Sequence, residues 1–243
     1  MDAAPVRRGQ PTVHEKWNTT TAILSGDAML ILAYQYFENY EPKVFLALAK
    51  LFSKTALQVC EGQQWDIDFE NSEKVLLKDY IKMIEYKTAV LVAAAMEMGA
   101  IIANASKEDC TAIYNFGLNL GIAFQIQDDY LDAFGNPENF GKQIGGDIIE
   151  NKKTYLYLKA LEFGSESETT EIKEFFKADN HGNHEKIDAV KALFLSSGAA
   201  DEALKGIEEY TQKAFEVLET INIDADKKNI LRHFGKNLMK RTV

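Results

Sequence analysis

Proline is nearly absent from this chain, and its scarcity constrains the fold more than any other feature of the sequence. The four prolines stand at positions 5, 11, 42 and 137, so long stretches contain no residue that breaks a helix. Apolar residues recur at three- and four-residue spacing, as in Val44, Leu48 and Leu51. No run of alternating apolar and polar residues predicts a strand. We therefore predict an all-α fold, with helices near residues 18–38, 42–66, 76–104, 107–133, 151–163, 167–178, 184–196, 199–221 and 226–240.

Two segments interrupt this helical pattern. The segment from Phe134 to Glu150 contains four glycines and Pro137, and we expect it to be irregular. The acidic segment from Asp66 to Ser72 is expected to form a surface loop. No internal repeat and no linker divides the chain, so we predict a single helical domain over residues 1–243.

Composition and charge exclude several classes of protein. With 243 residues and 46% hydrophobic content, the chain can bury a sizeable core. A net charge of −10 argues against general binding to nucleic acids or anionic membranes, because such binding needs a basic surface. The apolar run from Ala89 to Ala105 is short and contains Glu97, which predicts a buried helix and no transmembrane segment. Cys60 and Cys110 have no CxxC spacing, and the N-terminus has no apolar signal, so we expect a cytoplasmic protein with free thiols.

Three carboxylates lie close together on one predicted helix. At 100° per residue, the side chains of Gln125, Asp128, Asp129 and Asp132 fall within about 100° of arc. Like charges four residues apart repel each other, so a cation is expected opposite this face. Carboxylate oxygens suit Mg²⁺, which usually takes one or two of them together with water and substrate phosphate.

Basic and hydroxyl side chains accompany the acidic face at several points in the chain. Arginine offers a planar fork of donors to phosphate oxygens, and lysine offers a point charge. Nearby glycines let the backbone approach a bulky anion. The residues are Arg7, Arg8, Lys87, Thr88, Lys142, Lys152, Lys153 and Thr154. Together with the carboxylates they predict a site for a Mg²⁺-bridged diphosphate, in which charge on a pyrophosphate leaving group would be neutralised.

These residues stand in motifs that resemble those of the trans-isoprenyl diphosphate synthases, the polyprenyl synthetase family. The stretch from Phe124 to Asp132, FQIQDDYLD, is similar to the whole of the family's second aspartate-rich motif. Lys87-Thr88 resembles its lysine–threonine pair, and residues 2–11 resemble the tail of its first aspartate-rich motif. The loop after the second motif is matched by Gly141-Lys142, Gly146-Asp147 and Asn151-Lys152. The resemblance runs from residue 1 to about residue 160.

The resemblance implies a terpenoid-synthase-like helical bundle around a central cavity, and a homodimer. It also implies a Mg²⁺-dependent prenyltransferase of isoprenoid biosynthesis. Such an enzyme ionises an allylic diphosphate, joins the cation to isopentenyl diphosphate and releases pyrophosphate, so that the product is five carbons longer. By resemblance, the metal ions, more than one, would be bound by Asp2, Asp128, Asp129 and Asp132. The allylic diphosphate would be contacted by Arg7, Lys87, Thr88, Gln125, Lys142 and Lys152, and isopentenyl diphosphate by Arg8.

The chain departs from the family pattern at its beginning. In the family, the first motif normally begins with two aspartates, which stand three and four positions before its last aspartate. Only that last aspartate, Asp2, is present here. The upstream helices of the family are absent from this sequence. We therefore expect an N-terminally truncated form, a misassigned start or a degenerate homologue, with weak or no turnover from this chain alone. Product length is not predicted, because the positions that govern it precede residue 1. The cavity is expected to be lined by Leu91, Val92, Ala95 and Met96.

Two other functions stay open. A non-catalytic subunit of a heteromeric synthase would dock its partner through an apolar helix face, for which residues 37–51 and 92–102 are candidates. A terpene cyclase would share the bundle and the metal-assisted ionisation. Cyclases normally add an Asn/Asp-Ser/Thr-Glu signature, which we do not find, so the prenyltransferase is favoured.

Overall fold

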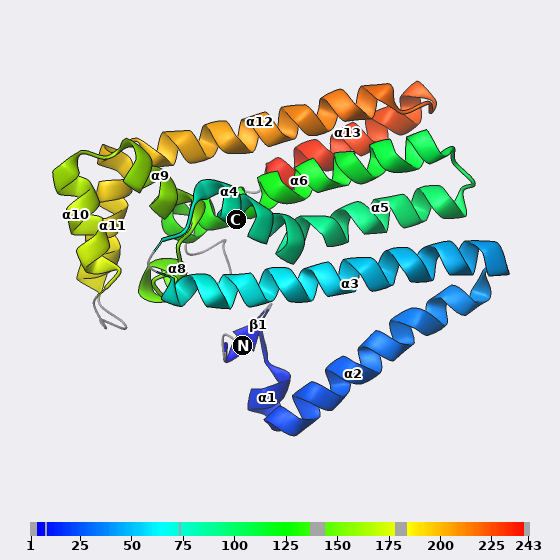
Figure 1. The fold of residues 1–243 in the computed structure, drawn as a ribbon, viewed down its shortest axis with the longest axis horizontal. Coiled ribbons are helices and arrows are strands. Elements are labelled where there is room, and N and C mark those ends of the chain that lie inside the picture. Colours follow the sequence, from blue (N-terminus) through cyan, green and yellow to red (C-terminus); the bar gives the residue numbers. More distant parts are fainter. Residues whose placement is uncertain (1–3, 8, 73, 137–143, 178–183, 241–243) are drawn as a thin grey trace. The chain divides into compact units, whose positions relative to one another are not determined.

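The computed structural model describes residues 4–7, 9–72, 74–136, 144–177 and 184–240, and these are almost entirely helical (Figure 1). The predicted all-α class is therefore confirmed. One short antiparallel hairpin, which the sequence pattern did not predict, pairs β1 with β2. In chain order the elements are β1 (Val6–Arg7), β2 (Gln10–Pro11), α1 (Val13–Lys16), α2 (Thr19–Gln35), η1 (Tyr36–Asn39), α3 (Pro42–Asn71), α4 (Leu77–Ile84), η2 (Glu85–Ala89), α5 (Val90–Ile102), α6 (Lys107–Phe134), α8 (Gly146–Ile149), α9 (Tyr155–Phe163), α10 (Glu166–Phe175), α11 (His184–Ser196), α12 (Ala199–Thr220) and α13 (Ala225–Met239).

The chain divides into two compact units, Met1–Phe52 and Ser53–Val243, and the boundary falls within α3. The first unit holds the hairpin, α1, α2, η1 and the start of α3. It contains a set of edge-to-face aromatic contacts. The ring centroids of Tyr34 and Phe52 lie 5.0 Å apart, and those of Phe37 and Phe52 lie 5.5 Å apart.

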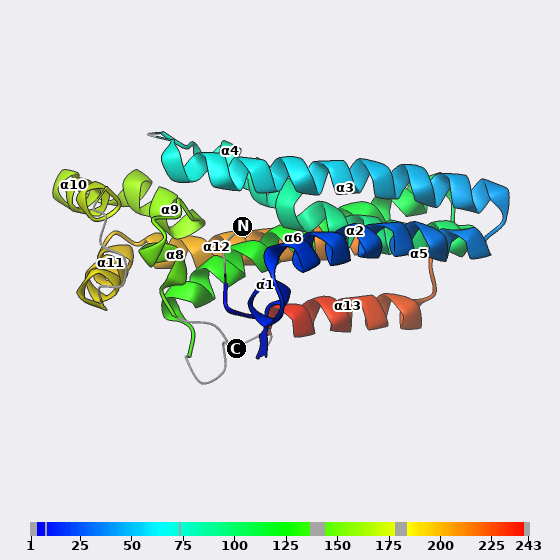
Figure 2. The same cartoon turned by 90° about the horizontal axis from the view of Figure 1, so that it is seen from below.

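The second unit contains almost all of the hydrophobic core. Helices α5 and α12 pack against α6 (Figure 1), and α13 packs against both α6 and α12 (Figure 2). Two clusters of buried side chains hold this unit together. The larger includes Tyr80, Ile126 and Phe194, and the smaller includes Phe116 and Leu218. The central cavity implied by the resemblance stays a prediction.

Two glycines of α6 let the end of η2 and the first turn of α5 approach it closely. A Cβ atom added at Gly121 would lie 2.5 Å from the Cα of Ala89, and one added at Gly117 would lie 2.8 Å from the Cα of Ala93. No real Cβ fits at such distances, so these positions need glycine for the two backbones to approach. The close approach places η2, which carries Lys87 and Thr88, beside α6 one turn before Gln125.

The structure corrects three of the predicted boundaries. Helix α3 continues to Asn71, so the surface loop expected from Asp66 to Ser72 is wrong over most of its length. The island expected to be irregular, 134–150, contains the short helix α8. The helix expected over 76–104 is interrupted by a π-helical turn, η2. No helix in the described part of the chain is long and apolar enough to cross a membrane.

Candidate functional site

The π-helical turn η2 carries two of the predicted site residues, Lys87 and Thr88. Turns of this kind are rare and often occur at functional sites. Helix α3 touches this turn at Gly62, where an added Cβ would lie 2.3 Å from the backbone nitrogen of Lys87. One turn further along α3, Asp66 forms an ion pair with Lys87, with Oδ2 2.5 Å from Nζ. Helix α3 therefore fixes both the backbone and the side chain of Lys87.

Thr88 and Gln125, which are 37 residues apart, meet between η2 and α6. The Thr88 hydroxyl donates to Oε1 of Gln125 at 2.9 Å. The Gln125 amide nitrogen donates in turn to Oδ1 of Asp129 at 3.0 Å. The structure thus brings together three residues that the sequence placed in one site, with Lys87 adjacent to Thr88 in the same turn.

Asp129 is buried and accepts three hydrogen bonds from the protein. Besides Gln125, the Tyr80 hydroxyl and the backbone N–H of Tyr155 donate to it, both to Oδ2, the latter at 3.2 Å. Burial, reinforced by the charge of Asp147, raises the pKa of Asp129 to about 7, although the hydrogen bonds act in the opposite direction. Burial and the neighbouring Asp129 carboxylate raise the pKa of the Tyr80 hydroxyl well above its usual value. Tyr80 therefore stays a hydrogen-bond donor at neutral pH.

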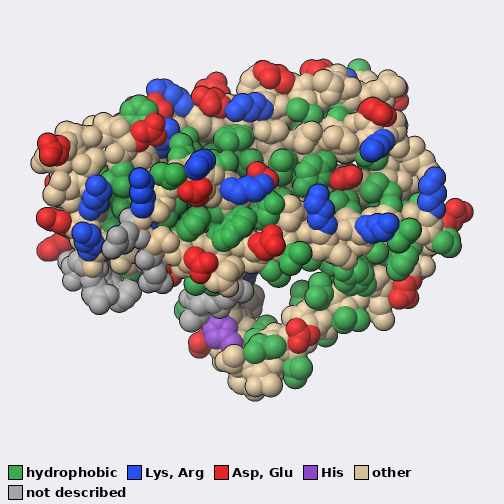
Figure 3. Space-filling model, in the orientation of Figure 1, with side chains coloured by type: hydrophobic (Ala, Val, Ile, Leu, Met, Phe, Trp, Pro, Cys, Tyr) green, Lys and Arg blue, Asp and Glu red, His purple; other side chains and the backbone are tan. Residues whose placement is uncertain are grey.

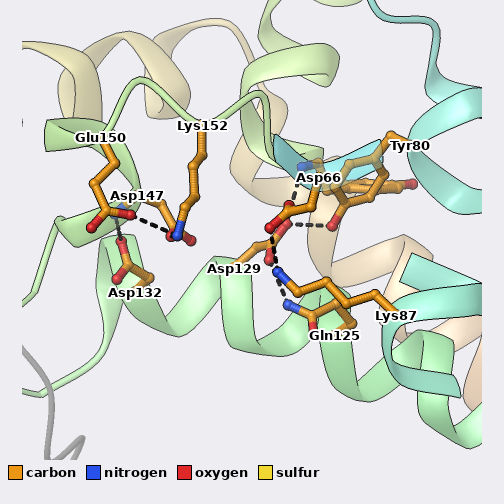
Figure 4. Close-up of polar contacts among 10 residues, drawn as sticks. Asp66, Tyr80, Lys87, Gln125, Asp129, Asp132, Asp147, Glu150 and Lys152 are labelled. Atoms are coloured by element: carbon orange, nitrogen blue, oxygen red, sulfur yellow. Dashed lines mark hydrogen bonds and ion pairs between the residues drawn. The ribbon is translucent and has the colours of Figure 1, made fainter. Parts of the chain in front are cut away.

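A second acidic group lies at the end of α6 and the start of α8 (Figure 4). The backbone N–H of Asp147 donates to Oδ2 of Asp132 at 3.1 Å. Nζ of Lys152 lies 2.6 Å from Oε2 of Glu150 and 3.4 Å from Oδ1 of Asp147. Burial raises the pKa of Asp147, and the charges of Glu150 and Asp128 add to the rise, while Lys152 opposes it. Carboxylates outnumber cations here, so the group is suited to a further cation.

The donor set fits a metal ion that is shared with a ligand. Among the described residues, no group of three or more His, Cys, Asp or Glu side chains is arranged to hold an ion by itself. Mg²⁺ does not need such a cage, because it usually keeps several waters and binds one or two carboxylates together with substrate phosphates. Asp128 and Asp132 can supply carboxylate oxygens on this face of α6, and Asp147 adds negative charge beside Asp128.

Comparisons with known proteins show to which family the chain belongs. The family model for polyprenyl synthetase matches residues 1–194. The chain belongs to the polyprenyl synthetase family. The family identified from the sequence motifs is thereby confirmed, and with it the class of enzyme, a prenyltransferase of isoprenoid biosynthesis.

Individual relatives share this class. The chain is 40% identical over 170 residues to a geranylfarnesyl diphosphate synthase of Natronomonas pharaonis, an alignment that covers 69% of this chain and 50% of the relative. It is 51% identical to a geranylgeranyl pyrophosphate synthase of known crystal structure, with a TM-score of 0.95, over 99% of this chain and 75% of that one. A geranylgeranyl pyrophosphate synthase from Corynebacterium glutamicum, solved in complex with isoprenyl diphosphate and magnesium, is 26% identical with a TM-score of 0.89, over 99% of this chain and 73% of that one. The chain thus spans half to three quarters of the length of these proteins.

Several site residues of this polyprenyl synthetase stay predictions. Asp2, Arg8 and Lys142 lie outside the described residues. Arg7 lies in β1 of the first unit and is exposed. Its contact with a diphosphate is therefore still an expectation from the family resemblance.

Four residues of the site were missed by sequence reasoning. Asp66 and Gly62 lie on α3, Tyr80 lies on α4, and Asp147 lies in the first turn of α8. The sequence pattern includes Asp147 only in the loop after the second motif, and it predicts a surface loop at Asp66. An uninterrupted helical pattern through Asp66 could have suggested that it lies inside the protein. Tyr80 gives no local signal, because its partner Asp129 is 49 residues away.

Proposed function

We propose that this chain condenses an allylic diphosphate with isopentenyl diphosphate to a longer polyprenyl diphosphate, in a Mg²⁺-dependent reaction that releases pyrophosphate. The observation that carries the proposal is the convergence of Lys87, Thr88 and Gln125 at the aspartate-bearing face of α6. Phosphate-binding donors from two elements thus lie beside carboxylates of the kind that Mg²⁺ prefers. The relative from Corynebacterium glutamicum, whose crystal structure contains isoprenyl diphosphate and magnesium, supports the same assignment.

Each group has a chemical task in this proposal. Lys87 and Lys152 supply positive charge to the diphosphate oxygens, and the Gln125 amide supplies an N–H donor. Asp128 and Asp132 supply carboxylate oxygens for the metal ions. When bound, Mg²⁺ would neutralise the charge that develops on the pyrophosphate leaving group. As the family resemblance implies, Asp2 is proposed to bind metal. Arg7 and Lys142 are proposed to contact the allylic diphosphate, and Arg8 isopentenyl diphosphate.

The allylic cation that remains after ionisation needs an apolar environment that excludes water. The apolar helix α5 follows directly after Lys87 and Thr88. Leu91, Val92, Ala95 and Met96 on this helix are proposed to line the space for the growing chain. Cys60 and Cys110 are unpaired in the structure, which fits the cytoplasmic location that we propose.

The test is a product assay on the whole chain. Incubation with Mg²⁺, dimethylallyl diphosphate and isopentenyl diphosphate should yield a longer prenyl diphosphate, detected by mass spectrometry. Lys87→Gln should lower the yield by about tenfold or more, because the charge at the diphosphate is lost. Absence of both product and Mg²⁺-dependent diphosphate binding would refute the proposal.

The assay also separates the proposal from the non-catalytic alternative. A non-catalytic subunit would bind a diphosphate with Mg²⁺ by calorimetry but would give no product on its own. A terpene cyclase would release a hydrocarbon or alcohol from the allylic substrate without consuming isopentenyl diphosphate. Product formation that depends on both substrates excludes these two functions.

A further inference from the structure

Tyr80 is one of the most deeply buried large side chains of the protein, with 2% of its surface exposed. It lies on α4 and belongs to none of the motifs that predict the diphosphate site. Its ring packs edge-on against that of Tyr155, with the centroids 6.1 Å apart. Its hydroxyl donates to Oδ2 of Asp129. Packing alone would be served by phenylalanine, so the hydroxyl calls for a separate explanation.

Asp129 is held from three directions. Oδ2 accepts from the Tyr80 hydroxyl and from the backbone N–H of Tyr155, and Oδ1 accepts from the Gln125 amide. As arranged, both oxygens of Asp129 act as acceptors, and all three neighbours present donors to them. Two donors on Oδ2 therefore fix the plane of the carboxylate, and this fixes the direction in which Oδ1 faces Gln125.

The fixed carboxylate decides which way the Gln125 amide points. Because Oδ1 of Asp129 accepts, the amide must turn its NH₂ group toward Asp129 and its oxygen toward the Thr88 hydroxyl. The second hydrogen of Nε2 has no acceptor among the described residues, and it can donate to a phosphate oxygen. With the amide reversed, an oxygen lone pair would take its place and repel the anion.

We propose that Tyr80 is a positioning residue: through Asp129 it fixes the Gln125 amide, and with it Thr88, in the orientation that receives the allylic diphosphate. The inference rests on the proposed function, in which Gln125 and Thr88 contact that diphosphate. It gives Asp129 a supporting role beside Asp128 and Asp132 rather than that of a metal ligand. Without the Tyr80 hydroxyl, the carboxylate loses one of two donors to Oδ2, and both it and the Gln125 amide can turn.

Tyr80→Phe isolates this role, since it removes one oxygen and keeps the ring. Tyr155→Phe is the matched control. Tyr155 belongs to the same aromatic pair, but its hydroxyl lies against Gly206, where an added Cβ would be 2.6 Å from it. Both variants remove a hydroxyl from the same cluster of the core. A difference between them reports on the contact with Asp129.

The measurement is calorimetric binding of dimethylallyl diphosphate to the whole chain with Mg²⁺, followed by steady-state kinetics of the condensation. Tyr80→Phe should raise the Kd of dimethylallyl diphosphate about tenfold, as loss of an outer-shell partner commonly does. The KM for isopentenyl diphosphate should change by less than about twofold, because that substrate binds elsewhere. Tyr155→Phe should leave both constants within about twofold of the wild-type values. An unchanged Kd in Tyr80→Phe, or equal rises in both variants, would overturn the inference.

A second set of variants tests whether Tyr80 acts through Asp129. In an Asp129→Asn background, Tyr80→Phe should have almost no further effect on the Kd, because the two residues act in series. If the two substitutions raise the Kd by independent factors that multiply in the double variant, the inference is overturned. If Tyr80→Phe shows no cooperative unfolding transition, it does not fold and cannot be used. The binding properties of Asp129→Asn then test the inference. It should weaken dimethylallyl diphosphate binding about tenfold while the half-saturating Mg²⁺ concentration stays the same. Wild-type affinity or a shifted Mg²⁺ dependence would contradict a positioning role.

The wild-type chain separates this inference from the proposed function. If the wild-type protein binds no diphosphate in the presence of Mg²⁺, the proposed function fails and the inference fails with it. If the wild-type protein binds and Tyr80→Phe binds equally well, only the inference fails.

Discussion

At the scale of single residues, Gly62 controls how closely α3 approaches the turn that carries Lys87. A side chain at this position would meet backbone atoms, 2.3 Å from the Lys87 nitrogen and 2.7 Å from the Tyr86 carbonyl carbon. Backbone cannot move aside as a side-chain end can. Gly62→Ala should therefore lower the free energy of unfolding by about 1–3 kcal/mol, as overpacking does in other cores. Urea denaturation followed by circular dichroism measures the change.

Gly99→Ala provides the control for this prediction. Gly99 also lies inside a helix, α5, but nothing lies within 4 Å of an added Cβ. Alanine should stabilise the protein there by up to about 1 kcal/mol, because glycine is a poor helix former. If both substitutions shift the unfolding midpoint in the same direction, the close contact at Gly62 has no energetic consequence.

The ion pair between Lys87 and Asp66 predicts a second effect at this scale. Only 13% of the Asp66 side chain is exposed, so removing its partner leaves a poorly hydrated carboxylate. Lys87→Met should lower the free energy of unfolding by about 1–3 kcal/mol. The double variant Lys87→Met/Asp66→Asn should recover most of that loss, since no charge is then left unpaired. Chemical denaturation of the two single variants and the double variant gives the coupling energy. If the losses in unfolding free energy of the two single variants add up in the double variant, the ion pair contributes nothing to stability.

At the scale of elements, the sequence predicted most helices because their apolar spacing is a local property. The helices expected at 107–133, 184–196 and 199–221 agree with α6, α11 and α12 to within about one residue. The turn η2 could not be predicted in this way. A π-helical turn depends on contacts with α3 and α6 from distant parts of the chain, and the residues 85–89 have ordinary helical composition.

The candidate site shows the same difference between features set by local periodicity and features set by long-range contacts. Asp128, Asp129 and Asp132 share a face of one helix, so their proximity could be predicted from the helical period. Tyr80 reaches Asp129 across 49 positions, and Lys153 donates to the backbone carbonyl of Phe69 across 84. Such partners leave no periodic pattern in the sequence. The sequence therefore predicts the site residues that stand in one contiguous motif. It misses the residues that only tertiary packing brings to the site.

Helix α11 supports the segment that leads to Lys152. Its Lys186 side chain is buried and donates to Oδ1 of Asn151 at 2.5 Å, and its Ile187 packs against Gly145. Asn151 has a left-handed backbone, with φ of 57°, which asparagine tolerates better than most residues. Lys186 therefore contacts the segment 145–151 at its last residue, and Ile187 contacts the segment at its first residue.

Burial lowers the pKa of Lys186 below its usual value of 10.5, and this predicts a pH dependence of stability. Between the lowered pKa and 10.5 the unfolded chain binds more protons than the folded one, so folding becomes more favourable as the pH rises. The stability of the wild-type protein relative to Lys186→Met should therefore increase as the pH is raised from neutral toward 10.5. Urea titrations at several pH values, on both proteins, measure the difference. A difference that is constant with pH would mean that Lys186 is not desolvated.

At the scale of the whole molecule, the two units differ in how they bury apolar surface. Of the buried hydrophobic residues in the described part of the chain, Leu48 alone precedes residue 53. Helix α2 has no buried residue, and apolar side chains are spread over its surface (Figure 3). The exposed large apolar residues of α2 are Ile23, Leu24, Met29, Leu30, Ile31 and Leu32. A helix that is apolar on all sides is normally covered by protein.

We expect a second copy of the chain to cover α2, in keeping with the homodimer that the family resemblance implies. Light scattering should then give about twice the chain mass of 27.3 kDa at micromolar concentration. Leu30→Glu should shift the mass toward that of one chain, because a carboxylate buried in an apolar interface costs several kcal/mol. Leu204→Glu, at a comparably exposed leucine on α12, should leave the mass unchanged. A single-chain mass for the wild-type protein at every concentration would show that the apolar surface of α2 does not drive self-association.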